Sequence, residues 1–267
     1  MQIPPLFNRF LLPGVIGFVV LSIFRTFFIS GDSFGTVLLL EFGSVAILFV
    51  LISESIKLTS SYKAAPTWLV TALLVLTFIG IFLKLLYNSI DSLFPIASVS
   101  YEKLIGLDVL PLVLILHTTT IIISVASLVI FRHLFFLKQS KNLNIYFNAM
   151  LIFIALTVAT SFTSEKRFTD YEFIQITFYV VATILMFMNS LKISWIAFLK
   201  KRQKRQLLLI SVLMIALLII YLSVSSDQSG FNNLLSGFSH AFYRFNNLIT
   251  VYGIIYFGVL FFTTLFH

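Results

Sequence analysis

The stretch TWLVTALLVLTFIGIFLKLLY, residues 67–87, decides the fold class. It is long enough to cross a membrane, because a helix of about 20 apolar residues spans the roughly 30 Å hydrocarbon core. The whole chain is similar in composition: 59% of its 267 residues are hydrophobic and 10% are charged, whereas soluble domains hold about 25% charged residues. This composition excludes a soluble globular domain and a disordered chain, and it predicts an all-α polytopic membrane protein.

Seven other runs of the same kind bring the expected number of transmembrane helices to eight. The runs cover residues 10–29, 36–56, 67–87, 108–132, 145–164, 173–198, 206–224 and 247–267. Several of the loops between them are short, so that successive helices are expected to be antiparallel neighbours. We therefore expect residues 1–267 to form a single transmembrane domain.

The basic residues between these runs predict the orientation of the chain. With the N-terminus in the cytoplasm, they gather in the segments that lie inside: Arg9, Lys57, Lys63, Arg132, Lys138, Lys141, Lys192, Lys200, Lys201, Arg202, Lys204 and Arg205. Cytoplasmic loops of membrane proteins carry such an excess of Lys and Arg, so we expect both ends inside. The net charge of +8 then reflects membrane insertion, and the run KKRQKR at 200–205 is a basic anchor beside anionic lipid headgroups.

One connection between runs is itself apolar. Between residues 225 and 246, large apolar side chains recur at helical spacing: Phe231, Leu234, Leu235, Phe238, Phe242 and Phe245. Polar residues fall between them. This pattern predicts a short interfacial helix near 231–246 on the outer face of the membrane.

Two ionisable residues lie within the first expected hairpin. Arg25 precedes the turn at 30–35 and Glu41 follows it, so antiparallel helices bring both side chains to a similar depth, about 12 Å below the turn at 1.5 Å per residue. We expect an intramembrane ion pair between them. Ionisable groups inside membrane spans are often functional, but a structural salt bridge that helps the hairpin to insert and pack is the favoured interpretation.

A polar cavity is predicted in the outer half of the membrane. Its candidate residues come from the fourth, fifth and sixth runs: His117, Thr118, Thr120, Thr157, Thr160, Ser161 and Gln175. Because imidazole changes its charge near neutral pH, such a cavity could bind a small ligand or sense protons. The alternative, which the residue types favour slightly, is that the hydroxyl groups bond to carbonyl groups of their own helices and hold neighbouring helices together.

Motifs of enzymes are missing from the sequence. The chain has no cysteine, which excludes disulfides, thiolate metal sites and cysteine nucleophiles. It also has no HExxH, P-loop or glycine-rich dinucleotide motif, and its four histidines form no cluster with metal-ligand spacing. We therefore expect no catalytic residue, no metal site and no cofactor within this chain, and no nucleic-acid partner.

The last run, VYGIIYFGVLFFTTLFH at 251–267, ends the sequence without a basic residue. We take this as an indication that a cytoplasmic effector domain follows. The run and the multi-span architecture resemble the N-terminal membrane regions of bacterial signalling proteins, in particular serine/threonine phosphatases of the SpoIIE-like, metal-dependent type. The resemblance implies a phosphatase domain in which aspartates hold two divalent metals, and no residue of this chain corresponds to those aspartates.

Three functions are compatible with the sequence, and a membrane-embedded enzyme is a fourth that it supports least. The favoured one is a sensor and anchor module of a signal-transduction protein, a homodimer or a partner of other membrane subunits in the bacterial inner membrane, with an unidentified ligand. The second is a non-catalytic subunit of a larger membrane assembly. The third is a small-solute transporter, which the absence of inverted repeats disfavours.

Overall fold

The fold is known from a computed structural model, which describes residues 16–17, 20–21, 34–59, 66–93, 110–136, 144–161, 172–192, 195–223, 235 and 239–266. This part of the chain is helical and contains no β-strand. Its elements are α2 (Phe34–Thr59), α3 (Pro66–Leu93), α5 (Leu110–Phe136), α6 (Asn144–Ala159), α7 (Glu172–Ser190), η5 (Trp195–Phe198), α8 (Lys201–Ser223) and α10 (His240–Phe266). The prediction of an all-helical chain is therefore confirmed for the described residues.

Five of the described helices are long and apolar enough to cross a membrane: α3, α5, α7, α8 and α10. Shorter apolar helical segments, Leu39–Ser53 in α2 and Ile145–Ala159 in α6, add to the same character. The chain is thus compatible with a multi-pass membrane protein. Eight spans are not supported by these helices, and most of the expected first run, 10–29, lies outside the described residues.

Two expected boundaries were wrong. The sixth run, expected over 173–198, is interrupted, because α7 ends at Ser190 and the short helix η5 begins only at Trp195. In the second case, residues 240–246 of the expected interfacial helix form the first turns of α10, whereas most of 231–238 lies outside the described residues. The reason is local: the Ser239 hydroxyl accepts a hydrogen bond from the Phe242 N–H at 3.4 Å, which is how serine caps the start of a helix.

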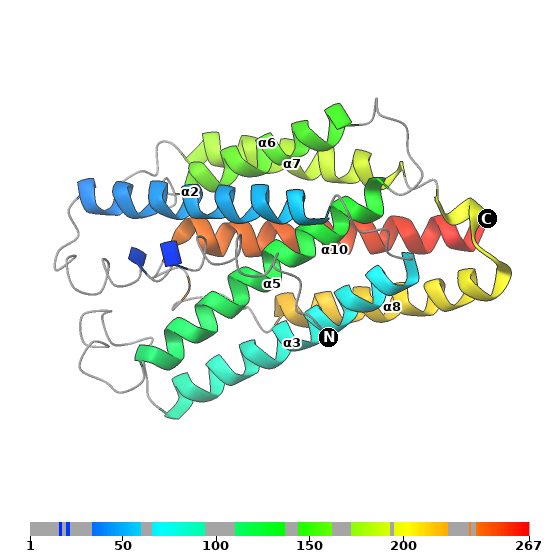
Figure 1. Cartoon of the computed structure of the whole chain (residues 1–267), viewed down its shortest axis with the longest axis horizontal. Helices are drawn as coiled ribbons and strands as arrows, with labels where there is room; N and C mark the ends of the chain where they lie inside the picture. Colours follow the sequence, from blue (N-terminus) through cyan, green and yellow to red (C-terminus); the bar gives the residue numbers. More distant parts are fainter. Residues whose placement is uncertain are drawn as a thin grey trace.

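The described helices alternate in direction along the long axis of the molecule (Figure 1). The starts of α2, α5, α7 and α10 lie toward the left, together with the ends of α3, α6 and α8; we name this the Glu41 end. The opposite end, where α3, α6 and α8 begin, is the Lys201 end. Helix α10 is central, since it packs against α2, α5, α6, α7 and α8.

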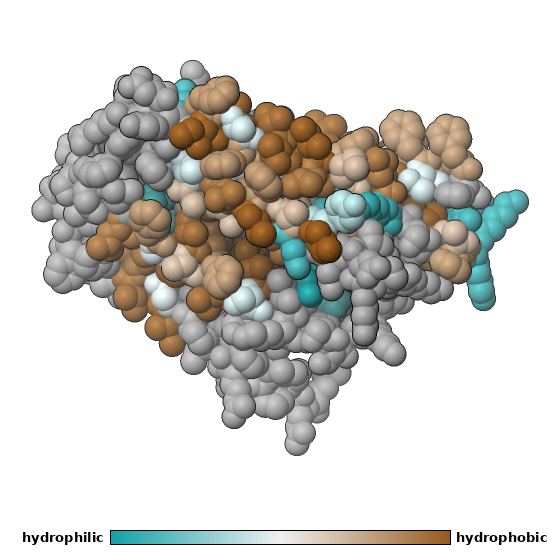
Figure 2. All heavy atoms as spheres, turned by 90° about the horizontal axis from the view of Figure 1, so that it is seen from above, coloured by the Kyte–Doolittle hydropathy of each residue, from teal (hydrophilic) through white to brown (hydrophobic). Residues whose placement is uncertain are grey.

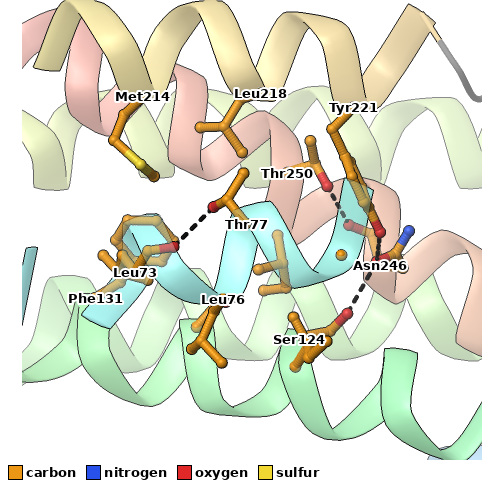
Figure 3. A pocket seen from close by; sticks show the side chains of 14 residues that line it. Leu73, Leu76, Thr77, Ser124, Phe131, Met214, Leu218, Tyr221, Asn246 and Thr250 are labelled. Carbon is orange, nitrogen blue, oxygen red and sulfur yellow. Dashed lines mark hydrogen bonds between the residues drawn. The ribbon is translucent and has the colours of Figure 1, made fainter. Parts of the chain in front are cut away.

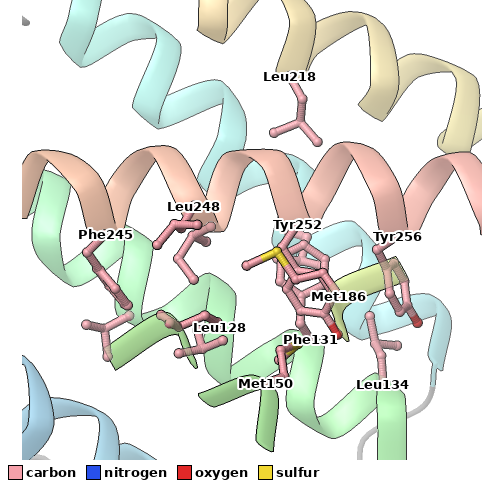
Figure 4. Close-up of a cluster of buried hydrophobic side chains, with 14 of the residues drawn as sticks. Leu128, Phe131, Leu134, Met150, Met186, Leu218, Phe245, Leu248, Tyr252 and Tyr256 are labelled. Atoms are coloured by element: carbon pink, nitrogen blue, oxygen red, sulfur yellow. The ribbon is translucent and has the colours of Figure 1, made fainter. Parts of the chain in front are cut away.

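Aromatic side chains fill the core between α5 and α10 (Figure 4). The ring of Phe131 lies 4.8 Å from that of Tyr252 and 5.3 Å from that of Tyr256, centroid to centroid. Gly253 of α10 leaves room for side chains of both neighbours, because a Cβ atom there would lie 2.9 Å from a methyl carbon of Leu218 on α8 and 3.3 Å from the ring of Phe131 on α5. Small residues let packed membrane helices approach closely in this way.

Large apolar side chains also cover the outside of the described helices. Phe49, Trp68 and Phe173 are each at least 70% exposed, and Figure 2 shows hydrophobic residues over much of one face, with strongly hydrophilic ones gathered toward its right end. Contiguous apolar surface on this scale marks contact with a membrane or another protein. A lipid-facing surface accounts for it directly.

Candidate functional site

Buried polar and charged side chains concentrate at the Glu41 end. Among them are Glu41 itself, Lys84 and His117, each at most 4% exposed. Burying such groups is costly unless hydrogen bonds replace their hydration. The partners that they find therefore show what holds this end together.

Glu41 on α2 caps the start of α10. One carboxylate oxygen accepts a hydrogen bond from the N–H of His240 at 2.8 Å, and the other accepts bonds from the N–H of Ala241 at 2.9 Å and the hydroxyl of Ser239 at 3.0 Å. The first N–H groups of a helix have no partner within it, and the helix dipole favours negative charge there. Glu41 thus fixes the first turn of the central helix to α2.

The expected partner of Glu41, Arg25, lies outside the described residues, so the predicted ion pair stays a prediction. The contact with α10 was missed by sequence analysis, since Glu41 and Ala241 are separated by 200 positions. One signal was present: Ser239, a residue type that often begins a helix, stands shortly before the last apolar run.

Lys84 on α3 caps the C-terminal end of α8. Its Nζ donates a hydrogen bond to the carbonyl oxygen of Tyr221, in the last turn of α8, at 3.1 Å, and lies 3.4 Å from the centroid of the Tyr221 ring. The last carbonyl groups of a helix attract cations. A lysine so near the end of an apolar run could extend to the headgroups, but Lys84 is only 1% exposed.

Asn246 on α10 joins α5 and α8 (Figure 3). Its Oδ1 accepts hydrogen bonds from the hydroxyl groups of Ser124 and Tyr221, both at 2.9 Å. These residues line a cavity of about 40 Å³ between α3, α5, α8 and α10, which is room for one to a few water molecules. The Nδ2 of Asn246 is buried and has no hydrogen-bond partner within the described part of the chain.

His117 on α5 bonds to α3 rather than to the polar residues of α6 and α7. Its Nδ1 shares a hydrogen bond with the hydroxyl of Tyr87, and both side chains are fully buried. Thr118 and Thr120 donate their hydroxyl protons to the carbonyl groups of Leu114 and Leu116 in their own helix. These two threonines therefore follow the structural interpretation of the predicted cavity.

A separate polar pocket of about 120 Å³ lies between α6, α7 and α10. The predicted residues Thr157 and Gln175 line it together with four others, Glu172, Ile176, Tyr179 and Arg244. The two predicted residues that follow α6 are not among those lining it: Thr160 bonds to the Leu156 carbonyl, and Ser161 is buried. The structure thus brings together two of the seven predicted cavity residues and adds Arg244, which lies in the segment 231–246 where an interfacial helix was expected.

The predicted basic anchor lies at the Lys201 end. Lys201, Lys204 and Arg205 line an open depression of about 490 Å³ with Thr264 and Leu265 of α10. Lys200 and Arg202 are exposed beside it. The Lys200 N–H donates a hydrogen bond to the side chain of Gln203 at 3.1 Å, an arrangement that satisfies a free donor at the start of a helix.

Lys192, in the turn after α7, is also at the Lys201 end. Its Nζ lies 3.0 Å from the centroid of the Tyr146 ring, and burial lowers the pKa of this ammonium group from its usual value. A cation over an aromatic face is stabilised by the charge distribution of the ring. This contact ties the end of α7 to the start of α6.

No family model, curated protein or solved structure matches the chain. Within the described residues, no group of three or more His, Asp and Glu side chains is placed to hold a metal ion. The argument for function therefore depends on the hydrogen bonds, charges and pockets of the chain itself.

Proposed function

We propose that this protein is the membrane sensor and anchor module of a signal-transduction protein, in which α10 carries a change from the Glu41 end to the Lys201 end. The observation that supports this most is the position of α10. It packs against five other described helices, and its first turn is held by the carboxylate of Glu41 on α2.

The polar contacts at the Glu41 end allow a stimulus to change the position of α10. Asn246 connects it to α5 and α8, and Arg244 places a charged group in the pocket that α10 shares with α6 and α7. A stimulus that alters these contacts changes the free energy of one position of α10 relative to another, which is the requirement for a two-state switch. At the other end, α10 meets the basic residues of α8.

Eight membrane spans with both ends in the cytoplasm belong to the same proposal, in the inner membrane of a bacterium. The orientation is supported by the Lys and Arg residues at the Lys201 end, Lys201, Lys204 and Arg205 among them. The absence of native cysteine makes a direct test possible. Single cysteines at Arg202 and at Gln228 should react with an impermeant maleimide from opposite sides; reaction from the same side would refute the topology.

The effector is proposed to lie in the cytoplasm, and the resemblance of residues 251–267 to phosphatase-linked membrane regions makes a protein phosphatase the first choice. Association as a homodimer is part of this proposal, since many signalling modules act through a symmetric pair. Chemical cross-linking in native membranes should trap a species of twice the monomer mass. Recovery of monomer alone would remove the dimer from the proposal.

A reporter fusion tests the sensor function. The catalytic domain of a bacterial adenylate cyclase is joined behind residue 267, and cyclic AMP is measured in cells with equal membrane levels of each fusion. We expect Glu41→Gln and Asn246→Leu to change the output about fivefold or more, within the usual range of allosteric coupling. Ser44→Ala, a buried change on α2 that removes only a bond to the Leu40 carbonyl, is the control. Equal output from all four chains would count against the sensor.

A small-solute transporter is the second candidate, and the polar pocket between α6, α7 and α10 favours it. A transporter needs a polar site that opens to each side in turn. Flux of radiolabelled glycine into proteoliposomes would support this candidate. Binding without flux would leave the sensor as the better account.

A further inference from the structure

We propose that the pocket between α6, α7 and α10 binds a small zwitterion, a free α-amino acid of the size of glycine or alanine. The proposal deepens the sensor function, on which it rests for its biological meaning, by naming the class of ligand. It depends on three observations: two opposite charges that do not pair, a buried amide without a partner, and the size of the pocket.

The charges come from two helices. Glu172 begins α7, and Arg244 lies in the second turn of α10. Both side chains line the pocket, and the described structure has no ion pair between them. Opposite charges that flank a polar space without meeting leave room for a molecule that carries the complementary pair. A guanidinium binds a carboxylate with two parallel hydrogen bonds, and a carboxylate binds an ammonium group.

Gln175 supplies the second observation. It is 4% exposed, and its Nε2 has no hydrogen-bond partner within the described residues. A buried donor left without a partner is costly, so it indicates that a ligand or water completes the site. The amide can donate to the same ligand carboxylate as Arg244.

Thr157 completes the polar lining. It donates its proton to the carbonyl of Phe153 at 2.8 Å, so that its oxygen remains able to accept a hydrogen bond from an ammonium group. Ile176 and Tyr179 supply apolar contact. The volume of about 120 Å³ is similar to that of a cavity of about 150 Å³ that holds benzene, a molecule of about the same number of non-hydrogen atoms as glycine or alanine.

Direct binding to the purified full chain tests the proposal. Nanodiscs of phosphatidylcholine and phosphatidylglycerol hold the protein, and isothermal titration calorimetry compares glycine, L-alanine, methylamine, acetate and erythritol. We expect glycine and alanine to bind saturably, and methylamine and acetate to bind about tenfold more weakly or worse, because each lacks one charge-assisted contact. Equal binding of acetate would show an anion site, equal binding of erythritol would show a polyol site, and either would overturn the proposal.

Variants locate the binding. Glu172→Gln and Arg244→Gln should each weaken glycine binding about tenfold or more, and Gln175→Leu should weaken it several-fold. Lys192→Gln, which also removes one charge but at the Lys201 end, is the control and should bind as the unchanged chain does. Circular dichroism and gel filtration show that each variant is folded. If Arg244→Gln and Lys192→Gln bind alike, the pocket is not the site.

A zwitterionic lipid headgroup is the other source of the same chemistry. Phosphatidylethanolamine added to the nanodiscs should leave glycine binding unchanged if the ligand is a free amino acid. If phosphatidylethanolamine weakens glycine binding and added phosphatidylcholine does not, the pocket binds the lipid headgroup, and the amino-acid proposal is overturned. The sensor function can fail separately: glycine that binds without changing the reporter output leaves the site intact and removes its signalling role.

Discussion

Glu41→Gln is the substitution that examines the structure most closely. It keeps the size of the side chain, removes the charge and replaces one acceptor oxygen by an NH₂ donor. In the native protein the carboxylate accepts three hydrogen bonds from the start of α10, from Ser239, His240 and Ala241. An amide has one oxygen and one NH₂ group, so it cannot accept bonds on both sides.

The expected loss follows from these contacts. If the glutamine oxygen stays with Ser239 and Ala241, its NH₂ group faces the N–H of His240, and one bond is replaced by two opposing donors. A hydrogen bond to a charged group contributes about 1.5–3 kcal/mol, and a negative charge at a partly buried helix N-terminus contributes up to about 2 kcal/mol. We expect the free energy of unfolding to fall by about 2–4 kcal/mol.

Unfolding by sodium dodecyl sulfate in mixed micelles, followed by near-ultraviolet circular dichroism, measures this difference. Ser44→Ala on the same helix is the matched control, because Ser44 is buried and bonds only to the carbonyl of Leu40. The control should cost less than about 1 kcal/mol. Equal stability of the two variants would refute the conclusion that Glu41 anchors α10.

Three further substitutions are tested in the same assay. Lys84→Met removes the ammonium group that donates a hydrogen bond to the carbonyl of Tyr221 and should lower the free energy of unfolding by about 2–4 kcal/mol. A change below about 0.5 kcal/mol would show that the buried methylene groups of Lys84, and not its ammonium group, stabilise this contact. Asn246→Leu removes an acceptor of the buried Tyr221 hydroxyl and one of the two acceptors of Ser124, which also donates to the Thr120 carbonyl, and should cost about 1–3 kcal/mol, whereas a stabilised variant would contradict the network. Gly253→Ala places a Cβ 2.9 Å from α8 and should cost about 1–3 kcal/mol, unlike Gly258→Ala, whose added Cβ meets nothing within 4 Å.

Helical content and apolar character could be predicted from composition and run length. The run at 67–87 lies within α3, and the run at 206–224 overlaps α8 closely. Boundaries were less predictable, because hydropathy averages over many residues and a helix end depends on single ones. Ser239 starts α10 seven residues earlier than the apolar run suggests, since its hydroxyl caps the first turn.

The polar contacts could be predicted only in part. Run position placed Glu41 and His117 inside the membrane, but it gave no information on which distant helix each side chain meets. Lys84 shows the limit most clearly: a lysine near a helix end could extend to the headgroups, whereas packing of α3 against α8 buries it beside the Tyr221 carbonyl. Such contacts depend on tertiary packing, which hydropathy does not encode.

The coupling along α10 can be measured directly by disulfide formation. Leu208 of α8 and Leu265 of α10 line the same depression at the Lys201 end. Both are replaced by cysteine in one chain, which has no native cysteine. The initial rate of oxidation by copper phenanthroline is compared in the native, Glu41→Gln and Ser44→Ala backgrounds. If α10 transmits changes between its ends, Glu41→Gln alters the rate about fivefold or more and Ser44→Ala does not; the same rate in all three backgrounds would contradict the account.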